Sequence, residues 1–425
     1  MNTAPSPRLL IRNAMIWDGT GADPYPGEVL VEDRRIARLA PAPARLDAAD
    51  ARVLDAGGLT LMPGLVEGHA HLSFIELPRS VELGDTPPEE HVLATMHNAR
   101  RLLDHGFTSA FSAASAKLRL DVVIRNEIAA GRIPGPRLRA ASPEITVTGG
   151  LGDERRLHLP RESFGLVADG EDEIARAVRL CIREGVDTVK INISGDDAAR
   201  AKGGSTVMRE GEVRTAVEVA HDFGRKVAAH ARASRAVLRA VDCGVDVIYH
   251  CEGADTEALD RLESVRDRVF CGPAIAPIHN ALHEAEARGL PRNPAREAEL
   301  ARVMEQSQRT YAEMRRRGIP VVIGGDYGFV ATPQGENARD IELYVKLFGY
   351  SPSEALQCAT RVGGALMGLE VGCIREGWLA DLLLVEGDPL ADVRILQDAA
   401  RLKFILQDGR IHKTALLCDK PGAAS

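Results

Sequence analysis

Two histidines separated by one residue, His69 and His71, are the first side chains in this sequence that could hold a metal ion. Residues i and i+2 of a β-strand point to the same side, so the two imidazoles would project together. Neutral imidazole nitrogens are common ligands of Zn²⁺ and similar ions. A His-x-His pair also arises by chance at strand ends, so the pair alone leaves a purely structural role open.

Four more polar side chains follow apolar, strand-like segments further along the chain. Lys190, His230, His250 and Asp326 each lie at or near the carboxyl end of such a segment. The intervals between the first three suit consecutive βα units. In a parallel barrel these ends form the active-site face. Together with the early pair they offer four imidazoles and one carboxylate, a donor set that suits two divalent ions, with Zn²⁺ expected and Mn²⁺ or Co²⁺ nearly equivalent.

Lys190 is an unusual member of this set. Val189 and Ile191 flank it, and a buried ammonium beside divalent cations would be strongly disfavoured. A neutral lysine amine can instead react with CO₂ to form a carbamate, whose two oxygens could bridge two metal ions. The alternative is a lysine that pairs with a nearby acidic side chain.

The elements that must position these side chains alternate along the middle of the chain. Amphipathic helices end at glycines, and each is followed by a short apolar segment, as at residues 187–191, 226–230, 246–250 and 320–326. This pattern is typical of βα units with a parallel sheet. It predicts an α/β fold, with a (β/α)8 TIM-like barrel over residues 63–372. The strand-rich ends, 1–62 and 373–425, are predicted to form one small β-sandwich domain from both termini.

Composition narrows the classes of function. The 425 residues carry a formal net charge of −8, which argues against nucleic-acid binding through phosphates. No apolar run reaches the ~18 residues of a membrane span, and the first residues lack the pattern of a secretory signal. The seven cysteines are an odd number without a CxxC pair, which favours a reducing compartment. We therefore expect a cytoplasmic protein that acts on a small molecule and binds neither nucleic acid nor membranes.

These motifs taken together resemble the amidohydrolase superfamily, over nearly the whole chain. The resemblance rests on the six polar residues above and on several flanking segments: residues 63–65, 106–108, 354–356, 359–360, 377–382 and 387–389. Some of these segments look like the imidazolonepropionase-like and Xaa-Pro dipeptidase-like members. The resemblance implies a distorted barrel with a β-sandwich, a carboxylated Lys190 between two metal ions, and a homo-oligomer. The branch with this lysine contains dipeptidases and carboxypeptidases, and ochratoxinases look similar.

The expected reaction is metal-assisted hydrolysis of an amide bond in an N-acyl amino acid or a dipeptide. A hydroxide shared by the two ions would attack the carbonyl, and Asp326 would accept its proton and pass it to the leaving nitrogen. One departure from the family concerns residues 148–153, where Leu151 replaces a histidine that many relatives are expected to place on the scissile carbonyl. This departure suggests a more apolar substrate or another hydrogen-bond donor.

Four residues are candidates for substrate binding. His279, where a strand is expected to meet a loop, could contact the substrate or the transition state, and Arg232 could bind a substrate carboxylate through two N–H groups. Ser73, two residues beyond His71, would lie on the same face. Tyr249 could offer its hydroxyl, although a strand neighbour of His250 should point the other way.

Two other functions remain open at this stage. One is a mononuclear cyclic-amide hydrolase of the imidazolonepropionase type, in which a bridging carbamate on Lys190 would have no use. The other is a non-catalytic scaffold that keeps the fold. Such scaffolds usually lose metal ligands, whereas every expected ligand type is present here.

Overall fold

The computed structural model describes residues 8–47, 49–159, 161–196, 200–416 and 418–419. Parts of the predicted terminal domain, residues 1–7 and 420–425, therefore lie outside the described residues. None of the helices within these ranges combines the length and the apolarity that crossing a bilayer requires.

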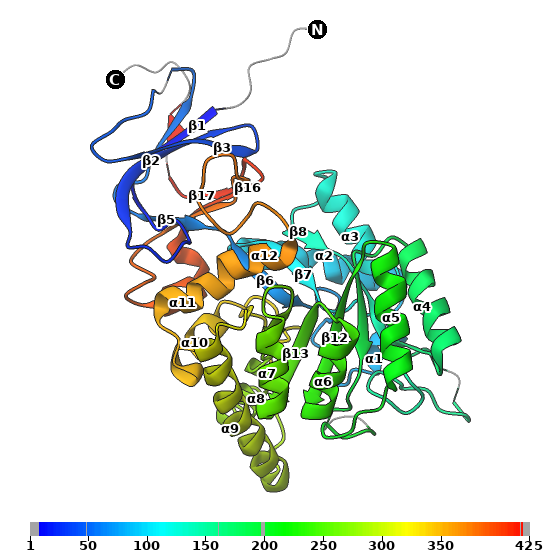
Figure 1. Ribbon diagram of the computed structural model, residues 1–425. Helices are drawn as coiled ribbons and strands as arrows, with labels where there is room; N and C mark the ends of the chain where they lie inside the picture. The colour runs from blue at the N-terminus through cyan, green and yellow to red at the C-terminus, as the bar shows by residue number, and fades with distance from the viewer. Residues whose placement is uncertain (1–7, 48, 160, 197–199, 417, 420–425) are drawn as a thin grey trace.

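A nine-stranded sheet combines strands from both ends of the chain (Figure 1). Its main path runs β17–β16–β15–β5–β1–β2–β3, with β4 paired to β1 and β18 paired to β4. The strands are β1 (Arg8–Ile16), β2 (Tyr25–Glu32), β3 (Arg35–Pro41), β4 (Arg52–Asp55), β5 (Thr60–Pro63), β15 (Leu382–Val385), β16 (Leu402–Gln407), β17 (Arg410–Thr414) and β18 (Cys418–Asp419). β5 and β15 pair antiparallel and join the two termini. The sandwich and the boundaries at 62 and 373 remain predictions.

The middle of the chain is an α/β fold with two parallel sheets. One sheet has the order β6–β7–β8, and the other has the order β10–β9–β11–β12–β13–β14. The strands are β6 (Leu65–Ala70), β7 (Phe107–Ser112), β8 (Arg137–Arg139), β9 (Ala141–Thr146), β10 (Gly165–Val167), β11 (Thr188–Asn192), β12 (Lys226–Ala233), β13 (Val247–Gly253) and β14 (Phe270–Gly272).

Helices follow most of these strands, and α8 to α12 come after the last of them. They are α1 (Glu82–Asp85), α2 (Pro88–Asp104), α3 (Leu120–Ala129), α4 (Glu171–Arg183), α5 (Glu210–Asp222), α6 (Ser234–Cys243), α7 (Thr256–Ser264), α8 (Ala276–His283), α9 (Pro294–Arg317), α10 (Arg339–Phe348), α11 (Pro352–Gln357) and α12 (Gly363–Met367). The longest, α9, begins after Asn293, whose side chain accepts from two backbone N–H groups, and it ends at Gly318 in the left-handed region.

Regular strand pairing does not close the predicted eight-stranded barrel. β8 and β9 are separated only by Ala140, so one chain segment serves both sheets. At the other edge, Cys271 N donates to Pro320 O at 2.9 Å and Gly68 N donates to Ile323 O at 3.0 Å. Residues 320–326 nevertheless form a single β-bridge instead of the expected strand. The reason is local, because Gly324 N turns to the Asp340 carboxylate at 3.0 Å and leaves the ladder.

Side chains from both parallel sheets share one apolar layer. Val66 and Phe111 from the smaller sheet, Ala228 and Tyr249 from the larger one, and Val322 from the segment between them belong to one buried cluster. Burial of such a layer is the main favourable contribution to folding. The layer also supports the polar side chains that follow it at the carboxyl ends of the strands.

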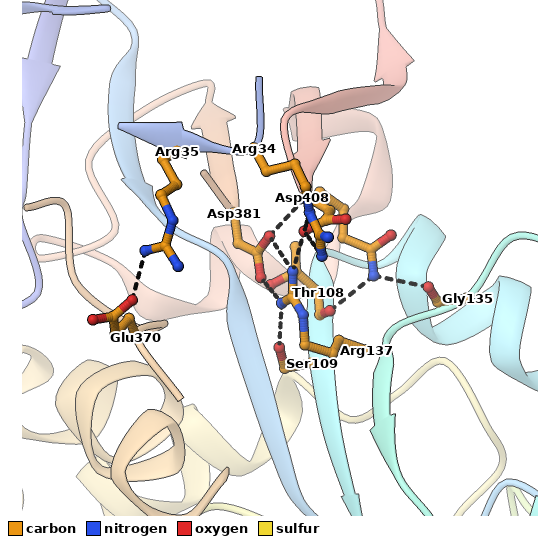
Figure 2. A network of polar contacts seen from close by, with 10 residues as sticks. Arg34, Arg35, Thr108, Ser109, Gly135, Arg137, Glu370, Asp381 and Asp408 are labelled. Atoms are coloured by element: carbon orange, nitrogen blue, oxygen red, sulfur yellow. Dashed lines mark hydrogen bonds and ion pairs between the residues drawn. The ribbon is translucent and has the colours of Figure 1, made fainter. Parts of the chain in front are cut away.

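Arg137 of β8 joins the parallel sheets to the terminal sheet (Figure 2). Its guanidinium donates to the carboxylates of Asp381 and Asp408, and the second of these contacts is 2.9 Å long. The Asp408 backbone N–H also donates to Asp381 at 2.7 Å. The Asp381 side chain is 1% exposed and that of Arg137 is 18% exposed, so this ion pair is largely withdrawn from water.

Replacing Arg137 with leucine is expected to lower the free energy of unfolding by about 3–5 kcal/mol, because Asp381 would keep a buried charge without its partner. Urea unfolding followed by circular dichroism measures this loss. Arg35→Leu is the matched control, since Arg35 and Glu370 form an exposed pair that should contribute about 1 kcal/mol or less. Equal losses in the two variants would contradict the buried pair.

Candidate metal centre

Five of the predicted ligands converge at the carboxyl ends of the parallel strands. His69 is in β6, His230 in β12 and His250 in β13, while His71 and Asp326 follow strand-like segments directly. The ring centroids of the histidines lie 5.0 Å (69–71), 5.7 Å (69–250) and 4.2 Å (230–250) apart. Asp326 Oδ1 is 3.1 Å from His71 Nε2 and 3.9 Å from His69 Nε2. Donor atoms of His69, His250 and Asp326 all lie within 4.8 Å of one another.

The outer hydrogen bonds of two rings leave their opposite ring nitrogens available to this cluster. His71 Nδ1 is 3.1 Å from the Ala114 carbonyl, and His230 Nε2 is 3.0 Å from the Gly195 carbonyl. A carbonyl only accepts, so each of these nitrogens carries a proton. The opposite nitrogen of the neutral His230 ring then has a free lone pair. His71 Nε2 faces the Asp326 carboxylate, a contact that a proton or a metal ion between the two atoms would satisfy.

Two further imidazole nitrogens have no partner of their own. His69 Nδ1 and His250 Nδ1 are buried and lack a hydrogen bond to any described residue. Buried polar groups without a partner are rare and call for a specific explanation. A donor set of imidazoles and a carboxylate with unused lone pairs fits divalent metal ions.

The electrostatics of the cluster produce the protonation states that metal binding requires. Burial lowers the pKa of His69 and His250 well below the usual value and lowers that of His230 to about 3, so the rings are neutral. Burial alone would raise the pKa of Asp326, but His69, His71 and Lys190 outweigh it and hold the pKa below its ordinary value. Histidine binds metal ions as the neutral imidazole and aspartate binds them as the ionised carboxylate, so these groups are in the forms that metal binding needs.

Lys190 lies in β11 and is 1% exposed. Its Nζ is 4.7 Å from the centre of the Tyr249 ring, and no residue in the described ranges forms an ion pair with it. Burial lowers its pKa, while Glu144 and Asp326 oppose the shift. The amine is thus shifted toward the neutral form that could accept CO₂, and the carbamate itself stays a prediction.

Left-handed backbone conformations occur where ligands leave their strands. His250 has φ 77°, Cys251 φ 56° and Asp326 φ 58°. Such conformations cost about 1–3 kcal/mol each in non-glycine residues and cluster at functional sites. At His250 the turn also breaks strand alternation, because Tyr249 already belongs to the interior layer and His250 would otherwise point outward.

The expected orientation of Tyr249 is therefore wrong. Its ring stacks on that of His69 with centroids 3.8 Å apart, and its hydroxyl donates to the Gly68 carbonyl at 2.7 Å. The side chain is fully buried. These contacts give Tyr249 a supporting position beneath the cluster and leave its hydroxyl engaged by the β6 backbone, which disfavours substrate binding by that hydroxyl.

Two of the other substrate candidates have protein partners. Ser73 is fully buried, and its hydroxyl accepts from the Ala116 backbone N–H at 2.8 Å. His279 lies in helix α8, not at the expected junction of a strand and a loop, and its Nδ1 is 3.2 Å from the Asn280 side-chain oxygen. Its ring is 4.8 Å from that of His283. Neither set of contacts assigns a substrate role.

Arg232 follows His230 on β12, as the sequence indicates, but its charge is already matched. Its guanidinium pairs with Asp196, in the loop after β11, at 2.9 Å and with Glu252, near the end of β13, at 2.5 Å. Two carboxylates around one guanidinium disfavour the binding of a third from the substrate. The arrangement instead ties three adjacent strand ends together.

Two buried acids behind the ligands were missed from the sequence. Glu67 accepts from the His69 backbone N–H at 2.9 Å and from Asn337 at 2.8 Å, while Asp340 accepts from Gly324 N at 3.0 Å. Burial, together with Asp340, raises the pKa of Glu67 to about 8, and burial raises that of Asp340 to about 7. These acids hold the backbone on either side of the cluster. The position of Glu67, two residues before His69, was the only signal for it in the sequence.

Comparisons with known proteins identify the family of this chain. The model of the amidohydrolase family matches residues 60–416. Ochratoxinase from Aspergillus niger is 24% identical over 378 residues, which cover 83% of this chain and 75% of that protein. Among solved structures, an amidohydrolase is 29% identical with a TM-score of 0.85, covering 96% of this chain and 100% of the other. A Xaa-Pro dipeptidase with bound methionine is 24% identical with a TM-score of 0.83, at 96% and 100% coverage.

The family match spans most of the chain and includes all six predicted ligands. Members of this family are generally metal-dependent, which suits the donor set described above. The similarity to hydrolases also argues against the non-catalytic scaffold. The chain therefore belongs to the amidohydrolase family and is a hydrolase that acts on carbon–nitrogen bonds.

Proposed function

We propose that this protein hydrolyses the amide bond of an N-acyl amino acid or a dipeptide at a centre of two divalent metal ions. The ligands would be His69, His71, Lys190, His230, His250 and Asp326. The observation that carries the proposal is the contact of His71 Nε2 with the Asp326 carboxylate at 3.1 Å, amid buried imidazoles with unused nitrogens. The similarity to ochratoxinase and to Xaa-Pro dipeptidase supports the type of bond.

The proposed metal ion is Zn²⁺, and the proposed sixth ligand is a CO₂-derived carbamate on Lys190. The four imidazoles favour Zn²⁺ chemically. When bound, such ions acidify a water molecule and polarise a carbonyl oxygen. The low exposure of Lys190 and the absence of an ion pair to it within the described chain support the neutral amine from which a carbamate forms.

Asp326 would handle the proton. Its Oδ1 is held against His71 and His69, and its left-handed backbone directs the carboxylate into the cluster. The ionised carboxylate would accept a proton from the attacking water and then deliver it to the leaving nitrogen, which completes the hydrolysis with the same group as base and acid.

An apolar cluster beside His71 suits a substrate with an apolar portion. The Phe74 ring stacks on His71 with centroids 4.2 Å apart, and Phe329 and Phe164 meet Phe74 edge-on at 5.4 Å and 6.0 Å. The replacement of the family's usual histidine by Leu151 agrees with this preference. His279 stays a candidate for a substrate contact.

The remaining parts of the proposal concern architecture and context. We infer that the two parallel sheets are parts of one distorted (β/α)8 barrel, because residues 320–323 form hydrogen bonds to the edges of both sheets. We also infer that the nine-stranded sheet is the predicted terminal β-sandwich.

We also propose a cytoplasmic homo-oligomer that acts on small amides and has no nucleic-acid or membrane partner.

The test is a hydrolysis screen with protein reconstituted separately with Zn²⁺, Mn²⁺ or Co²⁺. N-acyl amino acids and Xaa-amino acids with aromatic, proline or basic C-terminal residues are the substrates. We expect two ions per chain by metal analysis and activity that a chelator abolishes and metal restores. One ion per chain with activity on cyclic amides would favour the imidazolonepropionase type. A fully loaded protein without activity on any substrate would contradict the proposal.

A further inference from the structure

Glu144 is a buried acid beside the candidate centre that the proposed mechanism does not use. It lies in β9 directly opposite Lys190 of β11 in the parallel register. Paired residues of neighbouring strands present their side chains on the same face of a sheet. Glu144 therefore shares the interior face with Lys190, and it is 7% exposed.

Asn192 lies two residues after Lys190 and hence on the same face of β11. Its side-chain nitrogen donates to Glu144 Oε2 at 2.7 Å and to the Leu151 carbonyl at 3.0 Å. Both partners are acceptors, so the orientation of the amide is determined by its contacts. The nitrogen is thus fixed as the atom that donates, and the amide oxygen, Oδ1, is the atom left to accept.

Two acceptors in this pair have no donor. Asn192 is fully buried, and its Oδ1 has no hydrogen-bond partner in the part of the chain that the structure describes. Glu144 accepts one hydrogen bond, at Oε2, and no described residue donates to Oε1. The Lys190 ammonium forms no hydrogen bond or ion pair with either residue. Asn192 Oδ1 is thus a buried acceptor for which the described residues supply no donor, and it lies beside a carboxylate oxygen that no described residue engages.

The chemical complement of a carboxylate oxygen and an amide oxygen is a compact cation with several N–H donors. A primary ammonium has three donors and no acceptor. We propose that Glu144 and Asn192 bind the α-ammonium group of the acyl part of the substrate, so that the preferred substrates are dipeptides and not amino acids with an uncharged acyl group. This inference rests on the proposed function and names the substrate class within it.

The local charges agree with this assignment. Burial raises the pKa of Glu144, whereas Lys190 and Asn192 oppose the rise. A bound ammonium would add to the groups that favour the ionised carboxylate. Lys190 as a neutral amine or as a carbamate would not repel the substrate cation. The contact of Asn192 with the Leu151 carbonyl also connects this pair to the loop in which the family's usual histidine is missing.

The experiment compares two substrates that differ only in the ammonium group: an alanyl amino acid and the propionyl derivative of the same amino acid. The metal-loaded wild type should prefer the alanyl compound in kcat/KM. Glu144→Gln should lower kcat/KM for the alanyl compound by about 10- to 100-fold, the range expected for a charged hydrogen bond. The propionyl compound should change by less than about 3-fold, since the variant keeps its transition-state contacts.

Glu218→Gln on the exposed side of α5 is the matched control and should change neither substrate. Equal losses on both substrates with Glu144→Gln, or a wild type that prefers the propionyl compound, would overturn the inference.

Binding supplies a readout that does not depend on turnover. Calorimetry compares an aminoethyl-phosphonyl amino acid with its ethyl-phosphonyl counterpart on the wild type and on Glu144→Gln. A preference for the amine that the variant loses supports the inference even if the proposed hydrolysis fails. Equal affinity of the wild type for both compounds would refute it.

Discussion

Asp326→Asn is expected to keep the fold and to lose about 10³-fold or more in kcat, because a positioned general base and acid contributes about 10²–10⁴-fold. The amide of asparagine matches the carboxylate in size and can still offer one oxygen, but it cannot accept a proton at neutral pH. Steady-state kinetics on the best substrate of the screen measure the loss. Circular dichroism and metal analysis establish that the variant is folded and loaded.

Asp222→Asn, on the exposed end of α5, is the matched control and should retain wild-type kcat. Comparing kcat with kcat/KM is informative, because the loss of a group that acts in the transition state lowers both constants together. A loaded Asp326→Asn enzyme with wild-type turnover would remove Asp326 from the mechanism. It would leave the carboxylate as a ligand only.

Lys190→Ala is expected to bind fewer than two metal ions per chain and to lose about 10³-fold in kcat. Metal ions contribute several kcal/mol of charge stabilisation to the transition state, and about 4 kcal/mol corresponds to a factor of about 10³. Elemental analysis and kinetics measure the two effects. The lysine is 1% exposed, so its removal also opens space beside Tyr249.

The space left by alanine allows a sharper test of the carbamate. Propionate or another short carboxylate could enter it, supply two oxygens and restore both metal content and activity. Lys190→Met fills the same space with an apolar chain, so no carboxylate should rescue it. Two bound ions and normal activity in Lys190→Ala would contradict the carbamate.

The candidate substrate contacts show where local sequence reasoning ends. Arg232 was placed correctly on the strand of His230, but its partners come from two other elements: Asp196 from the loop after β11 and Glu252 from the end of β13. Glu144 and Asn192 were not singled out, because a lone Glu and a lone Asn carry no motif. Their significance depends on which acceptors remain without donors after folding.

The sequence by itself determined two features. One is the alternation of helices and apolar segments, and the other is the position of four polar residues at the ends of those segments: Lys190, His230, His250 and Asp326. Periodicity and helix-ending glycines are set by neighbours in the chain, and the active-site edge of a parallel sheet follows from strand direction alone. For this reason the α/β class, the joining of both termini in one sheet and the convergence of the ligands could be predicted.

Only the tertiary structure decided the irregular course of residues 320–326, the inward position of Tyr249 and the lack of an ion pair to Lys190 among the described residues. The course of residues 320–326 depends on the Asp340 carboxylate, which accepts a hydrogen bond from Gly324 N. The position of Tyr249 depends on the left-handed backbone at His250. Such features arise because hydrogen bonds and charges are satisfied by residues far apart in sequence, and those contacts exist only once the chain has folded.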